Sequence, residues 1–246
     1  MRYLLLLWLV LPPFSYAQTL WEQAGLRPLC AEVKPLLAHG LAEPQALVEQ
    51  FPDDLCEAFS VRLAHKLPAT VLNEAFRLLQ RPELAHLGQA ELQASLASEN
   101  LAHYRKMLQQ KPVKAERLAL IRRLNQASYS AQLAYQLRYE VGQTQVFWLL
   151  LNQHQAPTDK ALEAMTHAPS IALKKVSDEG VESFMLYAYR MIESEQLTQA
   201  IAVYQSDEVA ALLAAANDVI SEYFSERRLA LNAAAPQSHV AQPLLE

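Results

Sequence analysis

Apolar residues recur along the chain at helical spacing, and no stretch sustains the two-residue alternation that is typical of a half-buried strand. The strong helix formers Ala, Leu, Gln and Glu dominate throughout. Only five glycines occur in 246 residues, each of them isolated, so the chain offers neither hairpin turns nor a phosphate-binding loop of the P-loop or Rossmann type. The pattern predicts an all-α protein, a multi-helix bundle or array.

Proline and acidic residues divide this pattern into separate helices. One helix is expected over residues 19–37 and another from near Asp53, where acidic residues favour a first turn. A longer segment is expected over residues 113–153, with Gly142 as its bend. Because proline suits a first turn and disrupts a helix interior, five prolines are predicted to mark joints between helices: Pro68, Pro82, Pro112, Pro157 and Pro169.

Two stretches of the chain resemble each other. LNEAFRLLQRPELAHL, from residue 72, and LTQAIAVYQSDEVAAL, from residue 197, agree at six of sixteen positions. In each, an amphipathic helix ends at a polar corner and a new helix begins at once. Pro82 suits the first position of the new helix, and Ser206 suits an N-cap whose hydroxyl accepts a backbone hydrogen bond. We interpret the pair as an internal duplication offset by 125 residues, with Leu79 and Tyr204 both directed into a core; chance similarity between Ala- and Leu-rich helices is the alternative.

Residues 1–17 have the composition of a signal peptide. Arg2 precedes the apolar run YLLLLWLVL, and small residues, Ser15 and Ala17, occupy the recognition positions for cleavage. A membrane anchor is the alternative, but a bilayer requires roughly 20 apolar residues, and Pro12 interrupts the run earlier. We therefore expect a periplasmic or secreted protein without a transmembrane segment after cleavage.

The rest of the chain divides into two halves and a tail. Residues 18–112 form an N-terminal helical half with the first copy of the repeated unit, and residues 113–232 form a C-terminal half with the second. Residues 233–246 are predicted to be a disordered tail. Loss of Arg2 with the signal peptide changes the formal net charge from −5 to −6, which gives no electrostatic basis for binding nucleic acid.

Both cysteines of the chain, Cys30 and Cys56, follow the signal peptide. An exported protein meets an oxidising environment in which disulfides form and persist. Their pairing would close a loop of about 27 residues, which stabilises by roughly 3 to 4 kcal/mol in the chain-entropy model. The alternative is a pair of buried free thiols, because Cys56 shares a predicted helical face with Phe59 and Leu63.

The sequence assigns no catalytic residue, no metal ligand and no cofactor. Its seven histidines are scattered, and none has the H-x-x-x-H spacing of a zinc site on one helix; a metal site assembled from distant histidines stays an open alternative. Adjacent acidic pairs fall at predicted helix starts, where they stabilise the helix dipole. No G-x-S-x-G motif is present.

Tyrosine and arginine gather in the C-terminal half. Both residue types are enriched at protein interfaces, and tyrosine combines an apolar ring with a polar tip. They are candidates for lining a groove between helices; the favoured alternative places tyrosine at the edge of the core and arginine on its solvated side. The residues concerned are Tyr129, Tyr135, Tyr139, Arg122, Arg138, Tyr187, Tyr189 and Arg190.

The segment LTQAIAVYQSDEVAALL resembles the signature of a widespread family of exported bacterial all-helical proteins of unknown function, in which a helix ends in an aromatic pair, a Ser-Pro step and a Gly. ERLALIRRLNQASYSAQLAYQL, from residue 116, is similar to the leucine-rich helix that opens that domain. The chain departs from the signature at Val203, Asp207 and Val209. The resemblance covers roughly residues 114–228 and implies fold and compartment, with no catalytic residues to transfer.

These observations predict an exported, non-catalytic helical interaction or scaffold protein that binds a protein partner or a second copy of itself. The alternative from another class is a carrier that holds a hydrophobic ligand between helices. The two differ in the surface they need: a carrier requires an apolar cavity of several hundred cubic ångströms, and a scaffold requires an exposed apolar or Tyr/Arg patch.

Overall fold

The computed structural model describes residues 19–234, so the predicted signal peptide and nearly all of the predicted tail lie outside the described residues. Within residues 19–234 the chain forms twelve helices and no strand, which confirms the all-α prediction. The helices are α1 (Leu20–Gln23), α2 (Arg27–Ala38), α3 (Gln45–Val48), α4 (Leu55–Lys66), α5 (Ala69–Leu79), α6 (Pro82–Leu96), α7 (Ser98–Gln110), α8 (Ala115–Ala127), α9 (Ser130–Asn152), α10 (Asp159–Ala188), α11 (Ser194–Tyr204) and α12 (Asp207–Ala234).

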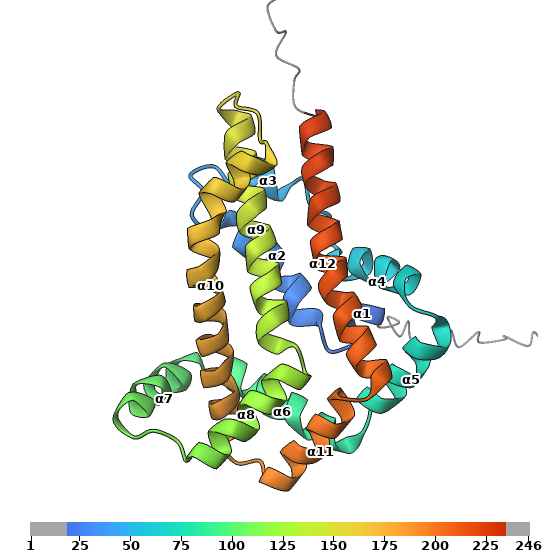
Figure 1. Ribbon diagram of the computed structural model, residues 1–246, viewed down its shortest axis with the longest axis vertical. Coiled ribbons are helices and arrows are strands. Elements are labelled where there is room, and N and C mark those ends of the chain that lie inside the picture. The colour runs from blue at the N-terminus through green and yellow to red at the C-terminus, as the bar shows by residue number, and fades with distance from the viewer. Residues whose placement is uncertain (1–18, 235–246) are drawn as a thin grey trace, which may run out of the picture.

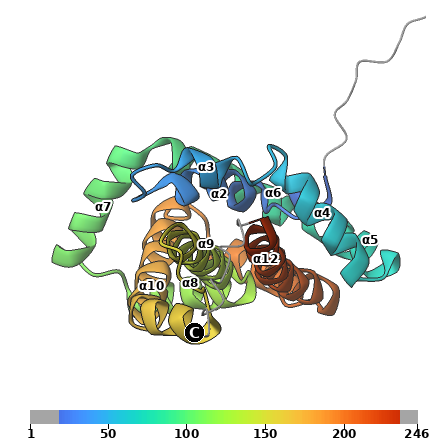
Figure 2. The same ribbon diagram turned by 90° about the horizontal axis from the view of Figure 1, so that it is seen from above.

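Helix α9 is the central element of the fold. It lies between the other two long helices, α10 and α12, and α2 packs against it from a third side (Figures 1 and 2). Helices α4 and α5 flank α12, while α6, α8 and α11 close the lower end in Figure 1. The N-terminal helices therefore cover a core that the C-terminal helices build.

An aromatic cluster joins the two predicted halves. The Trp21 ring lies 4.8 Å from the Phe59 ring, and Phe59 meets Tyr223 of α12 edge to face at 5.0 Å between centroids. Trp21 and Phe59 are fully buried, and Tyr223 is 2% exposed. Aromatic pairs in these geometries add about 0.5 to 1.5 kcal/mol to the burial of their area, so the first helices are anchored on α12.

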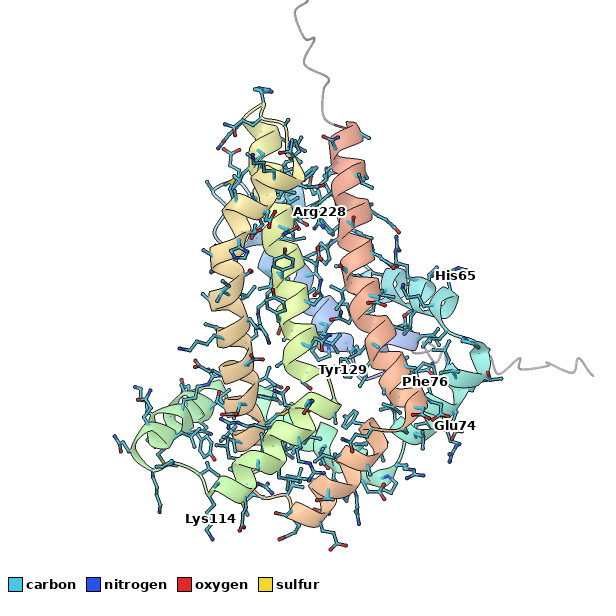
Figure 3. The ribbon with its side chains drawn as sticks, viewed as in Figure 1. His65, Glu74, Phe76, Lys114, Tyr129 and Arg228 are labelled. Atoms are coloured by element: carbon cyan, nitrogen blue, oxygen red, sulfur yellow. A yellow bond between two sulfur atoms is a disulfide. The ribbon has the colours of Figure 1, made fainter. Side chains whose placement is uncertain are left out.

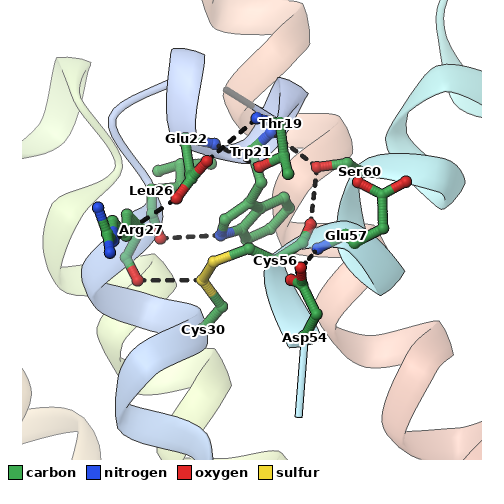
Figure 4. Close-up of polar contacts among 10 residues, drawn as sticks. All are labelled: Thr19, Trp21, Glu22, Leu26, Arg27, Cys30, Asp54, Cys56, Glu57 and Ser60. Atoms are coloured by element: carbon green, nitrogen blue, oxygen red, sulfur yellow. Dashed lines mark hydrogen bonds and ion pairs between the residues drawn. A yellow bond between two sulfur atoms is a disulfide. The ribbon is translucent and has the colours of Figure 1, made fainter. Parts of the chain in front are cut away.

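A disulfide links α2 to α4 beside this cluster (Figure 4). It pairs Cys30 with Cys56, whose Cα atoms are 5.4 Å apart. Next to it the Trp21 indole N–H donates to the Leu26 carbonyl at 2.8 Å, and the Ser60 hydroxyl donates to the Cys56 carbonyl at 2.7 Å. Asp54 caps α4 by accepting from the Glu57 amide at 2.9 Å, so this helix begins where the acidic cluster predicts.

The prediction of a single helix over residues 19–37 is wrong. Gly25 adopts a left-handed φ of 76° after α1, and the Leu26 amide donates to the Trp21 carbonyl at 3.1 Å. This is a Schellman C-cap, in which glycine is favoured because it lacks a Cβ. The chain therefore stops α1 and starts α2 at Arg27.

The predicted bend at Gly142 is also in the wrong place. The break falls between α8 and α9 at Tyr129, which has a φ of 56° although it is not glycine (Figure 3). The Asn125 side-chain oxygen accepts from the Ala131 amide at 2.9 Å and caps the new helix. Gly142 continues within α9, so the local capping contact, rather than glycine content, decides where the chain turns.

Pro169 does not mark a joint, since it lies inside the 30-residue helix α10. Its ring is exposed, and α10 packs along much of α9. Packing along a neighbouring helix compensates for the one backbone hydrogen bond that proline removes. The other four predicted joints do lie at or between helix ends: Pro68, Pro82, Pro112 and Pro157.

The two similar stretches form the pairs α5–α6 and α11–α12. Helices α5 and α11 are both 11 residues long, and in each pair the next helix begins after two residues, at Pro82 and at Asp207. The packing is reciprocal, because α5 lies against α12 and α11 lies against α6. The aligned positions Leu79 and Tyr204 are both partly buried against the core.

The Ser206 hydroxyl, at the corner before α12, was expected to accept a backbone hydrogen bond as an N-cap, and it makes a different contact. The Ser206 hydroxyl donates to the Val203 carbonyl at 2.8 Å, a contact with the end of α11. The backbone carbonyl of Ser206 accepts from the Ala210 amide at 2.9 Å, as an N-cap carbonyl does. Ser206 therefore holds the N-cap position while its side chain completes the preceding helix.

Candidate functional site

An apolar groove of about 610 Å³ runs between α9 and α10 and ends at the loop that follows α2. Its apolar residues come from all three segments, and the lining contains no carboxylate. The lining residues are His39, Gly40, Leu41, Arg138, Tyr139, Gly142, Gln143, Gln145, Val146, Leu149, Met165, Thr166, Pro169, Ser170, Ala172, Leu173 and Val176.

The walls of the groove present large apolar side chains to solvent. Leu149 is 40% exposed, Met165 is 49% exposed and Val176 is 64% exposed. A Cβ added at Gly142 would meet no atom within 4 Å, so glycine leaves space in the groove where any other residue would project into it. Neighbouring exposed apolar residues with a hollow between them are typical of a binding surface.

Polar groups lie along one stretch of the lining and are bonded to one another. The Gln143 amide donates to the Tyr139 hydroxyl at 2.5 Å and to the Thr166 hydroxyl at 3.3 Å. The Thr166 hydroxyl donates in turn to the Leu162 carbonyl at 2.8 Å. Burial, followed by the nearby Glu140 charge, raises the pKa of Tyr139, so this phenol is neutral at ordinary pH and serves as a hydrogen-bonding group.

One end of the groove is fixed by Gln145. Its side-chain amide donates to three carbonyls at the end of α2, those of Leu36, Leu37 and His39, at 3.1, 3.1 and 2.9 Å. The carbonyls of Leu36 and Leu37 belong to the last turn of α2, where a helix lacks amide donors from a following turn. The contact from α9 therefore holds the loop that carries His39, Gly40 and Leu41 against the groove.

Arg138 gives this end its positive charge. Its nearest carboxylate is Glu32 of α2 at 3.6 Å, a separation longer than that of a hydrogen-bonded pair. Both side chains are partly exposed. The guanidinium group is therefore held near the groove with donor capacity left over.

The predicted Tyr/Arg surface is brought together only in part. Tyr135 stacks on Tyr139 with ring centroids 5.8 Å apart, and Arg138 lies beside them in the groove lining. Arg122 pairs with Glu182 at 2.6 Å and borders a broader polar hollow with Tyr129 and Tyr135. Five of the eight predicted residues thus lie along one side of the α8–α9–α10 layer.

The other three lie at and just after the end of α10, where the two tyrosines are buried and Arg190 is exposed. Tyr187 is 7% exposed and Tyr189 is 2% exposed. The Arg190 guanidinium sits over the Tyr187 ring at 4.2 Å and donates to the Tyr187 carbonyl at 2.6 Å. This arrangement matches the alternative in which tyrosine packs at the core and arginine covers it.

The apolar walls of the groove were missed by the sequence argument, although a pattern indicates them. Met165 and Val176 lie exposed on α10 among charged and small residues, and Leu173 between them is half-buried. Such surplus apolar residues on the outer side of an amphipathic helix are a recognisable sign of a second contact surface. Gly142 also lines the groove, within α9 rather than at the bend expected of it.

A buried ion pair between α9 and α12 is structural. The Arg228 guanidinium donates to the Glu140 carboxylate at 2.8 Å, and the Ser221 hydroxyl donates to the same carboxylate at 2.9 Å. The Arg228 and Glu140 side chains are 13% and 5% exposed, and neither residue lines the groove. The bonds hold α12 along α9 (Figure 3).

Within residues 19–234, no group of three or more His, Cys, Asp or Glu side chains is arranged to hold a metal ion. In the same part of the chain, no helix combines the length and apolar character required to span a bilayer.

Comparison of the chain with protein-family models, with curated proteins and with solved structures finds no match.

Proposed function

We propose that the protein is an exported interaction module whose α9–α10 groove binds an amphipathic helical segment of a partner protein, with an acidic residue of that segment near Arg138. The observation that carries the proposal is the groove itself, apolar along α9 and α10 and free of carboxylates. Helix-in-groove recognition places apolar side chains at i, i+3, i+4 and i+7 into such a channel. Export is supported by the disulfide between Cys30 and Cys56, which persists in an oxidising compartment.

Charge decides the chemistry of the partner. The groove lining contains one cationic side chain, Arg138, and neither Asp nor Glu; Arg138 lies 3.6 Å from Glu32, which is outside the lining, and makes no closer ion pair. A segment with an acidic end is therefore attracted locally, and a basic segment gains no such contact.

A carrier function for a hydrophobic ligand is the second candidate, and the volume of about 610 Å³ favours it. Ligand-carrying pockets usually enclose roughly 70 to 90% of the ligand surface. Here the side chains of Leu149, Met165 and Val176 remain exposed along the walls, so a small ligand would stay in contact with water. A helix would cover these walls, which ranks partner binding first.

The test uses synthetic probes. Two fluorescent peptides share an amphipathic leucine pattern and differ by Glu or Lys at one end; dodecanoate represents a hydrophobic ligand. We expect the Glu peptide to bind at least about tenfold more tightly than the Lys peptide at low salt, and Gly142→Leu, which fills the groove, to abolish binding. Gly180→Leu on α10 is the matched control, since a Cβ there also meets no atom within 4 Å.

Three outcomes would overturn the proposal. One is equal binding of the two peptides, and another is peptide binding that survives Gly142→Leu. The third is saturable binding of dodecanoate without binding of either peptide, which would establish the carrier function instead. Analytical ultracentrifugation adds a direct check, because self-association that Gly142→Leu removes would identify a second copy as the occupant.

A further inference from the structure

A second, smaller cavity of about 280 Å³ lies where the two similar helix pairs meet. It is lined by residues that the 125-residue offset relates to one another: Leu79 with Tyr204, and Gly88 with Leu213. Apolar side chains from the corner between α1 and α2, from α2 and from α9 complete the walls. These include Leu26, Leu29 and Leu133.

Two of the polar groups of this cavity lie at positions where the two similar helix pairs differ. Glu91 stands at the position that aligns with Ala216, a fully buried core alanine of α12. Tyr204 stands at the position that aligns with Leu79. A carboxylate and a phenol thus enter a space that the pattern of the repeat would otherwise make apolar.

Glu91 has one hydrogen-bond donor and no counter-ion among the described residues. The Tyr189 hydroxyl donates to its carboxylate, and no Lys, Arg or His contributes to its charge environment. Burial raises the pKa of Glu91, against the opposing effect of the Tyr189 bond. A carboxylate so enclosed is destabilised unless a cation neutralises it.

Three further hydroxyl groups belong to residues that line the same cavity. The Tyr204 hydroxyl makes no hydrogen bond to another described residue, and burial raises the pKa of this phenol. The Ser128 and Ser130 hydroxyls, 2.7 Å apart, also line the cavity. They flank Tyr129, whose left-handed φ of 56° places both serines at the corner before α9.

The start of α9 also borders the cavity, and a helix N-terminus favours anions. Its macrodipole corresponds to roughly half a positive charge, whereas Glu91 supplies a full negative charge, and the Asn125 side chain already accepts from the Ala131 amide. The carboxylate therefore decides the sign of the ligand. A metal ion is not the match, since the cavity has a single carboxylate and the walls are largely apolar.

We propose that this cavity binds a small primary ammonium compound with a short apolar body. The ammonium group donates to Glu91, to Tyr204 and to a serine hydroxyl, and the apolar body lies against Leu84, Leu133 and Leu213. The volume lies near the lower end of ligand cavities, roughly 300 Å³, so the ligand is small. This site is separate from the α9–α10 groove, and neither proposal depends on the other.

Calorimetry and NMR titration with ethylamine, isobutylamine and isopentylamine, each compared with the alcohol of the same skeleton, test the proposal. We expect at least one amine to bind saturably and about tenfold or more tightly than its alcohol, because only the amine neutralises Glu91. Glu91→Gln keeps an acceptor for Tyr189 and should remove this preference. Gly88→Leu should block both compounds, since Gly88 lines the cavity and a Cβ there meets no atom within 4 Å.

Gly180→Leu is again the matched control and should bind the amine as the wild type does. Thermal unfolding of each variant confirms that it is folded before titration. The proposal is overturned if the wild type binds none of the amines, if amines and alcohols bind equally, or if Glu91→Gln binds amines with unchanged affinity.

Discussion

The pairs α5–α6 and α11–α12 begin alike and end differently. Their first helices have the same length and their second helices begin after the same two-residue corner. Helix α6 then stops after 15 residues, whereas α12 continues for 28 along α9, α4 and α5. Local residues set the corner in both pairs, and the neighbours available to each second helix set how far it runs.

The two regions are also stabilised by different means. The segment that leads into α5 is cross-linked through Cys30 and Cys56. The extension of α12 has no cystine and is held by the buried pair of Glu140 and Arg228. If the pairs are copies of one unit, as we propose, each copy is stabilised by a different contact outside the residues that the copies share: the disulfide in one region and the buried ion pair in the other.

The largest expected effect is at the ion pair. Arg228→Met should lower the free energy of unfolding by about 3 to 5 kcal/mol, because it leaves the Glu140 carboxylate buried without its partner. The matched change in the first pair, Arg77→Met, removes an exposed ion pair with Glu74 and should cost far less. Urea denaturation measures both. A double variant, Glu140→Gln with Arg228→Met, should recover part of the loss; if it recovers none, the pair is not coupled.

Removing the disulfide tests how the segment that leads into α5 is stabilised. The double variant Cys30→Ala with Cys56→Ala should lose about 3 kcal/mol, as expected for a closed loop of about 27 residues. Denaturation of the wild type with and without reductant provides the comparison. Thiol titration of the denatured, unreduced protein should find no free thiol, and two reactive thiols would disprove the bond.

Equivalent core positions test the shared part of the two pairs. Leu87 of α6 and Leu212 of α12 are aligned leucines, 2% and 0% exposed. Replacing either with Ala should cost about 3 kcal/mol, since both leave a cavity in packed surroundings. Similar losses would sharpen the comparison; a difference above about 2 kcal/mol between them would argue that the resemblance is superficial.

A pH titration of stability addresses the position where the pairs diverge most. Burial raises the pKa of Glu91 above its ordinary value of 4.5, so the folded protein binds this proton more tightly than the unfolded chain does. The carboxyl group's stabilisation is present below about pH 4.5 and is lost as the pH rises through the folded-state pKa. Glu91→Gln should therefore be more stable than the wild type at neutral pH. An advantage that persists unchanged at pH 3.5 would contradict this assignment.

The smallest expected effect distinguishes two roles of Ser206. Its hydroxyl donates to the Val203 carbonyl at 2.8 Å, so Ser206→Ala should cost about 1 kcal/mol, the net value of a hydrogen bond. An ionised Asp cannot donate, and Ser206→Asp should be no more stable than Ser206→Ala. If Ser206→Asp instead matches the wild type, the side chain acts as an N-cap acceptor.

Several features follow from the sequence because they depend on neighbours along the chain. Helical periodicity and the scarcity of glycine determine the all-α fold, and Pro82 and Asp54 determine where α6 and α4 begin. The signature of Gly25 was available too, since glycine after a short amphipathic stretch is the usual C-cap residue. Such choices involve contacts within a few residues, which a linear pattern contains.

The binding surfaces depend instead on contacts between distant segments. Gln145 meets the end of α2 more than one hundred residues away, and Glu91 meets Tyr189 across 98 residues. Helix α10 continues past Pro169, where the local sequence would favour a helix end, and it packs along α9. The sequence alone determined the all-α class and several helix starts, and it left Cys30 and Cys56 with no other cysteine to pair with. Tertiary packing decided which side chains line the groove and the cavity, because helical periodicity specifies which face is apolar but not which helix lies against it.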